Sequence, residues 1–193
     1  MIVIGLTGSI AMGKSTAAAM LTRLGLPVFD ADATVHALTG PKGAALPHLE
    51  ALFPGAVSDA GLDRMAVGAQ VFAQPDKKRA LEAILHPMVR ARQVAWLKRQ
   101  RRTRRKACVL DVPLLFETGG EKRCDAVFVV SAPAFLQAQR ALARPGMTAE
   151  KLAGIRAAQM PDADKRRRAD AVIPTGLGKA VTLRALKAAL RTL

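Results

Sequence analysis

A glycine-rich segment near the start of the chain ends in a lysine followed by two hydroxyl side chains. Residues 5–16 read GLTGSIAMGKST, and within them Gly8, Gly13, Lys14 and Ser15 fit the pattern G-x-x-x-x-G-K-[ST]. In loops of this pattern, backbone N–H groups surround a chain of phosphates, the lysine contacts the terminal phosphates, and the hydroxyl is a ligand of Mg²⁺. The sequence therefore predicts a phosphate-binding loop.

The residues on either side of this loop predict a strand and a helix. The apolar run IVIGLT at 2–7 is typical of a short buried strand, and STAAAMLTRLG at 15–25 is a helical pattern that Gly25 can end. A helix that begins at the loop directs its N-terminal dipole at a bound anion. A glycine turn without a ligand, which is the alternative, does not explain this order of strand, loop and helix.

Three aspartates close two other apolar runs. Asp30 and Asp32 end PVFDAD at 27–32, and Asp111 lies near the end of ACVLDVP at 107–113. Ligands of open α/β sheets bind beyond the carboxyl ends of the strands. In an extended segment Asp30 and Asp32 would face the same way, so that one could accept the proton of an acceptor hydroxyl while the other orients it or supports the metal. The alternative is that Asp32 caps the following helix.

Apolar runs and helical patterns alternate along the chain, which predicts an α/β layered fold with a parallel sheet buried on both faces. Strands are predicted at 2–7, 27–32, 107–113, 126–132 and 169–174, and a closing helix at 178–192. The roughly 70 residues between the second and third runs are too many for a simple crossover. They carry helical patterns at 63–73 and 76–102, so we expect an inserted helical lobe.

The composition is that of one globular unit. The chain has 193 residues, 50% of them hydrophobic, and no run approaches the ~18 apolar residues that span a bilayer. Its first residues, MIVIGLTG, lack the pattern of a signal peptide, so we expect a soluble cytoplasmic protein. The two cysteines, Cys108 and Cys124, form no C-x-x-C pair, and neither a disulfide framework nor a zinc site is predicted.

The chain is strongly basic, with 30 Lys and Arg against 15 Asp and Glu and a formal net charge of +15. Many of these cations lie in KRQRRTRRK at 98–106. Such a surface attracts polyanions of any kind, but a charge run is more often a solvated end of a helix. Binding of single-stranded nucleic acid needs stacking aromatics. The chain has no tyrosine, one tryptophan and six phenylalanines, so the nucleic-acid interpretation is weak.

The length of the chain favours a small kinase over a motor or a switch, because a small kinase needs only a phosphate loop, a substrate lobe and a lid that excludes water. The chain also resembles the dephospho-coenzyme A kinases over almost its whole length. The matching segments are GLTGSIAMGKST at 5–16, FDAD at 29–32, LHP at 85–87, DVPLLFE at 111–117, QR…R at 139–144, AAQ at 157–159 and KRRRADAVI at 165–173. The loop is shared by many enzymes, whereas DAD, LHP and VPLLFE in this order are specific.

This resemblance implies the P-loop nucleoside-triphosphate hydrolase fold in its small-kinase form, a five-stranded parallel sheet flanked by helices. Residues 1–31, 104–138 and 165–193 would form the nucleotide-binding core, 32–103 the helical substrate lobe and 139–164 the lid. The implied reaction transfers the γ-phosphoryl of ATP to the ribose 3′-hydroxyl of dephospho-coenzyme A, with Mg²⁺. We expect a monomer whose partners are these two small molecules, with no specific nucleic acid and no membrane.

The resemblance also assigns roles to individual residues. The implied catalytic residues are Asp32, as the base for the 3′-hydroxyl, with Lys14 and Arg140; the substrate-binding residues are Asp30, His86 and Glu117; and the magnesium ligands are Ser15 and Asp111. The residues implied to bind ATP are Gly8, Ala11, Met12, Gly13, Lys14, Ser15, Thr16 and Arg144.

Several of these residues have an alternative interpretation. His86 can be a helix-entry residue fixed by Pro87, and Glu117 can hold a lid arginine or cap a turn. Arg140 and Arg144 lie four residues apart, so on a helix they would share a face, directed either at the transferred phosphate or at solvent.

A few positions depart from the family pattern. Ala11 replaces a loop glycine, which is acceptable only if its φ stays negative. Pro145 replaces a polar residue after the second lid arginine, and Pro174-Thr175 replace an Asp-Asn pair near the expected adenine pocket. The adenine contacts are therefore the part that the resemblance predicts least. Gln159 matches the lid-flanking glutamine of the family, but no chemistry follows from the residue itself.

Two other functions compete with this one. Another small nucleoside or nucleotide kinase would share the loop and the lid. A nucleic-acid-binding protein would use the basic run at 98–106. Neither accounts for DAD, LHP and VPLLFE together.

Overall fold

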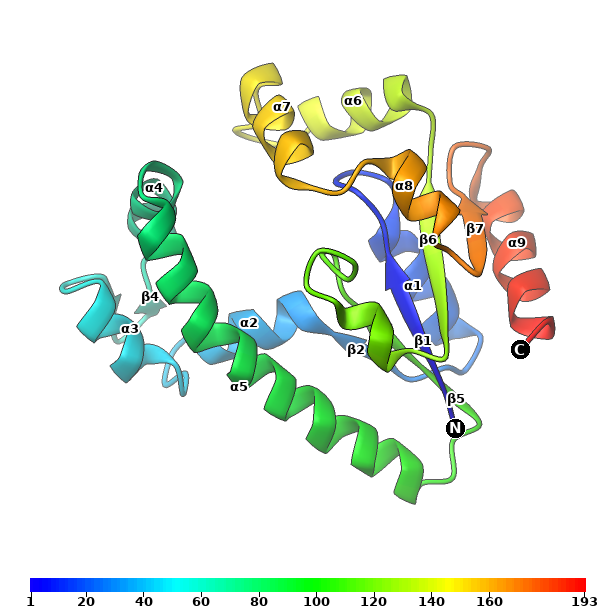
Figure 1. Cartoon of the computed structure of the whole chain (residues 1–193), viewed down its shortest axis with the longest axis horizontal. Coiled ribbons are helices and arrows are strands. Elements are labelled where there is room, and N and C mark those ends of the chain that lie inside the picture. Colours follow the sequence, from blue (N-terminus) through cyan, green and yellow to red (C-terminus); the bar gives the residue numbers. More distant parts are fainter. The chain divides into compact units, whose positions relative to one another are not determined.

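The chain divides into two compact units in the computed structural model (Figure 1). The structure describes residues 1–193, except for the side chain of Phe72. The first unit consists of Met1–Phe29 and Gln100–Leu193, and the second of Asp30–Arg99. The first unit therefore holds the predicted phosphate loop, and residues 139–164 belong to it as well.

A five-stranded parallel sheet forms the centre of the first unit, which confirms the predicted fold class. Its strands are β1 (Ile2–Thr7), β2 (Val28–Asp30), β5 (Ala107–Asp111), β6 (Ala126–Ser131) and β7 (Ala171–Pro174). They lie in the order β2-β5-β1-β6-β7. The strand that leads into the phosphate loop thus has a neighbour on each side, with the ends of β5 and β6 beside its own.

Helices connect these strands in the first unit, and a last helix follows β7. They are α1 (Lys14–Arg23), α6 (Ala134–Leu142), α7 (Ala149–Ala158), α8 (Asp162–Arg167) and α9 (Lys179–Arg191), with the short 3₁₀ helix η1 (Gly120–Arg123). The first of them ends as predicted, because Gly25 adopts φ +86, a left-handed conformation that glycine takes without steric cost. The predicted closing helix is confirmed as α9.

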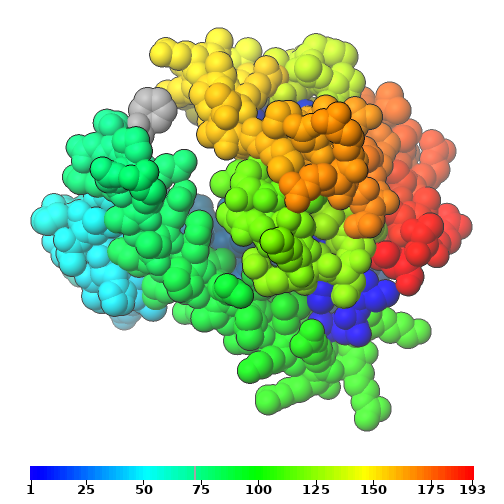
Figure 2. All heavy atoms as spheres, in the orientation of Figure 1, coloured from blue at the N-terminus to red at the C-terminus, as the bar shows by residue number. Residues whose placement is uncertain are grey.

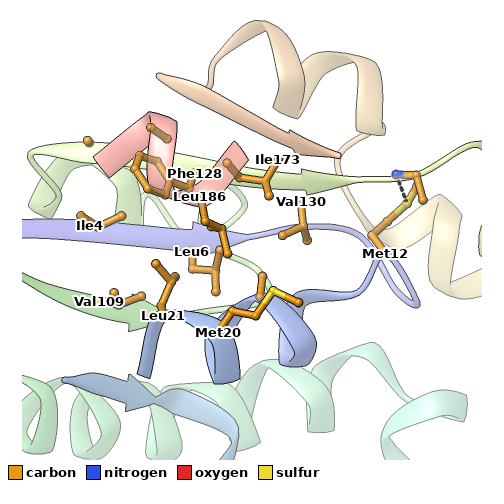
Figure 3. Close-up of a cluster of buried hydrophobic side chains, with 14 residues drawn as sticks. Ile4, Leu6, Met12, Met20, Leu21, Val109, Phe128, Val130, Ile173 and Leu186 are labelled. Atoms are coloured by element: carbon orange, nitrogen blue, oxygen red, sulfur yellow. Dashed lines mark hydrogen bonds between the residues drawn. The ribbon is translucent and has the colours of Figure 1, made fainter. Parts of the chain in front are cut away.

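The sheet is covered on both faces, which explains why its strands are continuous apolar runs. Successive residues of a strand point to opposite faces. On one face, Leu6 and Phe128 pack with side chains of α1 and α9 (Figure 3). On the other face, Val127 packs with Leu115 and Phe116 from the segment that follows β5.

The second unit is mainly helical, which confirms the predicted helices at 63–73 and 76–102. Its elements are α2 (Ala31–Thr39), α3 (Leu46–Leu52), α4 (Arg64–Ala73) and α5 (Pro75–Arg102), with an antiparallel pair β3 (Val57–Ser58) and β4 (Gly61–Leu62). Leu38 and Leu49 pack with Leu81 and Leu85 of α5, so the unit has a core of its own. The β3–β4 pair was not predicted, since two-residue strands are too short to show alternation.

The predicted strand at 27–32 is wrong in its last two residues. The strand ends at Asp30, and α2 begins at Ala31. The Asp30 carboxylate accepts a hydrogen bond from the Ala33 N–H at 2.9 Å, and the Thr34 hydroxyl donates to the Asp30 carbonyl at 2.8 Å. The first of these bonds satisfies an N–H group that a helix N-terminus leaves unpaired, so the helix starts earlier than the apolar pattern indicates.

The basic run at 98–106 is exposed at every position except Gln100. Figure 2 shows long side chains around residue 100, in green, projecting from the surface. The run therefore forms a solvated end of α5 and the loop after it. No helix in the described part of the chain is both long and apolar enough to cross a bilayer.

Candidate functional site

The phosphate loop joins β1 to α1, and two of its glycines are required by geometry. A Cβ at Gly8 would lie 2.3 Å from Val130 Cγ2, so only glycine lets the loop pass the end of β6. Gly13 adopts φ +87 and is the N-cap of α1. Because Gly13 has no side chain to cap the helix, the first turn of α1 offers its N–H groups to an anion.

The loop lysine is held by a carboxylate from the neighbouring strand. Leu6, near the end of β1, pairs in register with Asp111 of β5, which places this acid beside the loop. Lys14 Nζ lies 2.6 Å from Asp111 Oδ1, and the Asp111 side chain is only 5% exposed. Two residues that the sequence assigned to the site therefore meet at the carboxyl edge of the sheet.

The expected negative φ of Ala11 is wrong. Its φ is +59, in the left-handed region that favours glycine. For a residue with a Cβ, this conformation costs about 1 kcal/mol. The side chain is buried, and it packs with Ala141 of α6 and Leu152 of α7. The Ala11 methyl group therefore makes apolar contacts that a glycine at this position could not make.

Thr175 holds the loop from the end of β7. Its hydroxyl donates to the Met12 carbonyl at 2.6 Å, and a Cβ at Gly13 would lie 3.1 Å from the Thr175 Cβ. The Ala132 N–H donates to the Met12 sulfur at 3.2 Å, the dashed line in Figure 3. Thr175, one of the positions that depart from the family pattern, thus fixes the phosphate loop.

Arg140 lies beside this loop, whereas Arg144 lies outside the helix that carries Arg140. One Arg140 guanidinium nitrogen donates to the Thr175 carbonyl at 2.9 Å. The prediction that the two arginines share a helix face is wrong, because α6 ends at Leu142. Pro145 disfavours helical backbone at the residue before it, which accounts for this early end.

Glu117 contacts two residues that were not predicted as its partners. One of its oxygens lies 2.9 Å from the ammonium of Lys165, which is fully buried, and the same oxygen accepts from the Met160 N–H at 2.9 Å. Burial alone would raise the pKa of this carboxyl. The contact with the Lys165 ammonium and the hydrogen bonds from the backbone outweigh burial, so the pKa of Glu117 is lower than its ordinary value. Its partner is a lysine rather than a lid arginine.

Three of the assigned residues belong to the second unit. Asp32 is exposed in the first turn of α2, while Asp30 supplies the cap of that helix. The alternative that Asp32 is the cap is therefore wrong. His86 is exposed within α5, and Pro87 lies inside the same helix, so His86 is not a helix-entry residue.

The oxygen ligands near the loop fit a magnesium ion that arrives with phosphates. Mg²⁺ usually keeps several waters and takes one or two protein oxygens together with substrate phosphates. The Ser15 hydroxyl is exposed at the first turn of α1, next to Lys14 and its partner Asp111. Among the described residues, no group of three or more His, Cys, Asp or Glu side chains could hold a metal by itself.

Comparison with known proteins decides which family this site belongs to. The model of the dephospho-CoA kinase family matches residues 2–177. The chain belongs to the dephospho-CoA kinase family. A dephospho-CoA kinase of Rhodospirillum rubrum is 61% identical over 189 residues, which cover 97% of this chain and 90% of that one. One of Paramagnetospirillum magneticum is 62% identical over 164 residues, or 85% and 77% of the two chains.

Solved structures show that members of the dephospho-CoA kinase family and other small kinases share this fold. TT1252 from Thermus thermophilus is 40% identical with a TM-score of 0.85, covering 100% of this chain and 97% of that one. Dephospho-CoA kinase from Campylobacter jejuni is 23% identical with a TM-score of 0.67, covering 98% and 96%. Shikimate kinase from Acinetobacter baumannii, at 18% identity, has a TM-score of 0.55 over 100% and 94%. The last two show the shared kinase fold.

Sequence reasoning missed three residues that shape the loop in this family member. Thr175 was noted only as a departure, Gln159 had no derived chemistry, and Gln137 was not singled out. Gln159 accepts a hydrogen bond from the Ile10 N–H, and Gln137 donates to the Ile10 carbonyl. The sequence around a single glutamine or threonine does not indicate its hydrogen-bond partner, because that partner is more than 100 residues away in the chain.

Proposed function

We propose that this protein transfers the γ-phosphoryl group of ATP to the ribose 3′-hydroxyl of dephospho-coenzyme A, giving coenzyme A and ADP. The observation that carries the proposal is membership of the dephospho-CoA kinase family over residues 2–177. The phosphate loop supports it, with Lys14 and Asp111 paired beside the N-terminus of α1. These parts suit a triphosphate, while the acceptor follows from the family.

Catalysis of phosphoryl transfer needs positioning and neutralisation of charge more than covalent chemistry by the protein. Lys14 and the N–H groups at the start of α1 would hold the β and γ phosphates. Ser15, with Asp111 nearby, would hold Mg²⁺, which when bound neutralises charge on the phosphate oxygens. The ion pair with Asp111 keeps the Lys14 ammonium at the carboxyl edge of the sheet, beside the loop that surrounds the phosphates.

Arg140 and Arg144 would act on the transferred phosphate as cations of the lid. Arg140 is already anchored to the Thr175 carbonyl, beside the loop glycine Gly13. Arg144 is exposed beyond the end of α6. A fixed and a solvent-exposed arginine are suited to different steps, the first to orientation and the second to closure over the phosphate.

Asp32 is our assignment for the base that accepts the proton of the 3′-hydroxyl, with Asp30, His86 and Glu117 assigned to the substrate side. The Asp32 carboxylate is exposed, as a base that meets a substrate must be. One carboxylate oxygen of Asp30 instead accepts the hydrogen bond that caps α2. This difference favours Asp32 over Asp30 as the base.

The test is ADP release by purified protein with ATP and Mg²⁺, comparing dephospho-coenzyme A, adenosine and AMP as acceptors. We expect turnover with dephospho-coenzyme A at least tenfold above the other two, and its loss when EDTA removes Mg²⁺. Faster turnover of adenosine or AMP would assign the protein to nucleoside or nucleotide phosphorylation instead. Size-exclusion chromatography with light scattering tests the expectation of a monomer, and fractionation of the source cells tests that of a cytoplasmic protein.

A further inference from the structure

The peptide groups of Ile10, within the phosphate loop, are hydrogen-bonded by two side chains from far along the chain. The Ile10 N–H donates to Gln159 Oε1 at 3.0 Å, and Gln137 Nε2 donates to the Ile10 carbonyl at 3.0 Å. Gln137 lies on α6, and Gln159 follows α7. Gln159 belongs to the segment 139–164 that the sequence assigned to the lid, and Gln137 lies two residues before that segment. Both hydrogen-bonding groups of one loop residue are therefore held by side chains from α6 and from the C-terminal end of α7.

Gln137 is itself fixed in orientation. Its side chain is buried, and its Oε1 accepts from Arg156 Nε at 3.0 Å and from a second guanidinium nitrogen at 2.6 Å. A guanidinium has only donors, so the amide oxygen must face Arg156 and the NH₂ group must face the Ile10 carbonyl. The chain of bonds thus runs from α7 through Gln137 into the loop.

The next loop residue provides independent support for this link. Ala11 has φ +59, which costs a residue with a Cβ about 1 kcal/mol. Its buried methyl packs with Ala141 and Leu152, which lie on α6 and α7. Burying one methyl group stabilises by ~0.8 kcal/mol, which offsets most of that cost. Polar and apolar contacts therefore join the same part of the loop to the same two helices.

We propose that Gln137 and Gln159 are positioning residues for phosphoryl transfer, which clamp the Ile10 peptide groups and so hold the phosphate loop in its catalytic conformation. This inference rests on the proposed kinase function. Transfer depends on the placement of the phosphates relative to Lys14 and the loop N–H groups, and a displacement of about 1 Å can lower a rate 10²-fold. The clamp fixes the backbone from which those groups extend.

The first experiment measures the clamp without substrates, by hydrogen exchange of the amides in residues 8–13. Gln159→Met keeps the side-chain length but removes the acceptor for the Ile10 N–H. Its matched control is Gln139→Met, an exposed glutamine on α6. We expect at least tenfold faster exchange of this segment in Gln159→Met and wild-type exchange in Gln139→Met.

The second experiment measures steady-state kinetics of the same variants and of Gln137→Met and Gln137→Glu. Gln137→Glu keeps an acceptor for Arg156 but loses the donor to the Ile10 carbonyl. If the loop contact matters, both Gln137 variants and Gln159→Met lose about tenfold in kcat, while KM for dephospho-coenzyme A is unchanged. If only the anchoring of Arg156 matters, Gln137→Glu retains wild-type kcat, which would overturn the role of Gln137.

Unchanged exchange in Gln159→Met, or faster exchange with kcat within twofold of wild type, would overturn the clamp. Gln159 is only half-buried, so this variant keeps the test decisive even if the Gln137 variants fail to fold. The exchange experiment needs no substrate. A wild-type protein without turnover of dephospho-coenzyme A would therefore refute the proposed function and leave the exchange result readable.

Discussion

Lys14 Nζ and Asp111 Oδ1 lie 2.6 Å apart, with the lysine side chain 16% and the aspartate side chain 5% exposed. The pairing follows from strand register, because Asp111 stands opposite Leu6, two residues before the first loop glycine Gly8. The acid of one strand thus fixes the cation of a loop that leaves the neighbouring strand. The placement of the loop lysine is therefore a property of the sheet as well as of the loop.

We expect Lys14→Ala to lower kcat at least 10²-fold while the far-ultraviolet circular dichroism stays that of wild type. The lysine supplies the charge that meets the β and γ phosphates, and loss of one such contact typically costs 10² to 10³-fold. Lys187→Ala, which removes an exposed lysine of α9, is the matched control and should keep wild-type turnover. Retention of a tenth of wild-type kcat by Lys14→Ala would count against the assigned role.

Arg140→Ala and Arg144→Ala should each lower kcat more than they weaken ATP binding. Groups that act on the transferred phosphate contribute chiefly in the transition state. Steady-state kinetics and ATP titration measure the two effects, with Arg184→Ala, an exposed position of α9, as the control. A change confined to KM for ATP would show that the arginine only binds the ground state.

Most of the fold could be predicted from the sequence, because strands buried on both faces are continuous apolar runs and the loop pattern marks the first strand and helix. The start of α2 could not, since the Asp30 cap overrides the extended pattern that Asp32 suggested. The positive φ of Ala11 was also missed, because the packing that offsets its cost comes from residues about 130 to 140 positions away. The hydrogen bonds of Ile10 were missed for a similar reason, because they also come from distant residues. Single polar residues show no periodicity from which their partners could be identified.

Glu117→Gln should destabilise the folded protein by about 3 kcal/mol, because it leaves the fully buried Lys165 ammonium without a carboxylate. The double variant Glu117→Gln/Lys165→Met should lose less, since no charge remains buried. Urea unfolding of both variants measures the difference. Equal losses in the single and double variants would show that the ion pair is not the origin of the effect.

The same pair predicts how stability depends on pH. The pKa of Glu117 is lower in the folded protein than in the unfolded chain, so its contribution is present above the unfolded pKa. That contribution is lost as the pH falls through the lower, folded pKa. Unfolding curves of wild type and Glu117→Gln should therefore converge in acid. Curves that stay parallel from neutral pH into acid would contradict the assigned pKa shift.

Asp32→Asn should remove most activity while both substrates still bind. The amide keeps the size of the side chain and a hydrogen bond to the 3′-hydroxyl, but it cannot accept the proton. Removal of a general base typically costs 10² to 10⁴-fold in rate. Single-turnover rates and equilibrium titration of each substrate separate chemistry from binding, and raised Mg²⁺ should not restore the rate.

Asp30 is the comparison residue, since it lies two positions away and caps α2 through its carboxylate. Asparagine caps helices about as well as aspartate, so Asp30→Asn should keep wild-type stability, whereas Asp30→Ala should lose ~1 kcal/mol. If Asp30 also orients the acceptor or supports the metal, raised Mg²⁺ should partly restore the activity of Asp30→Asn. A loss of only a few-fold in Asp32→Asn, with chemistry still limiting the rate, would leave Asp32 as an acid that merely stabilises the first turn of α2, and the base would have to be sought among other residues.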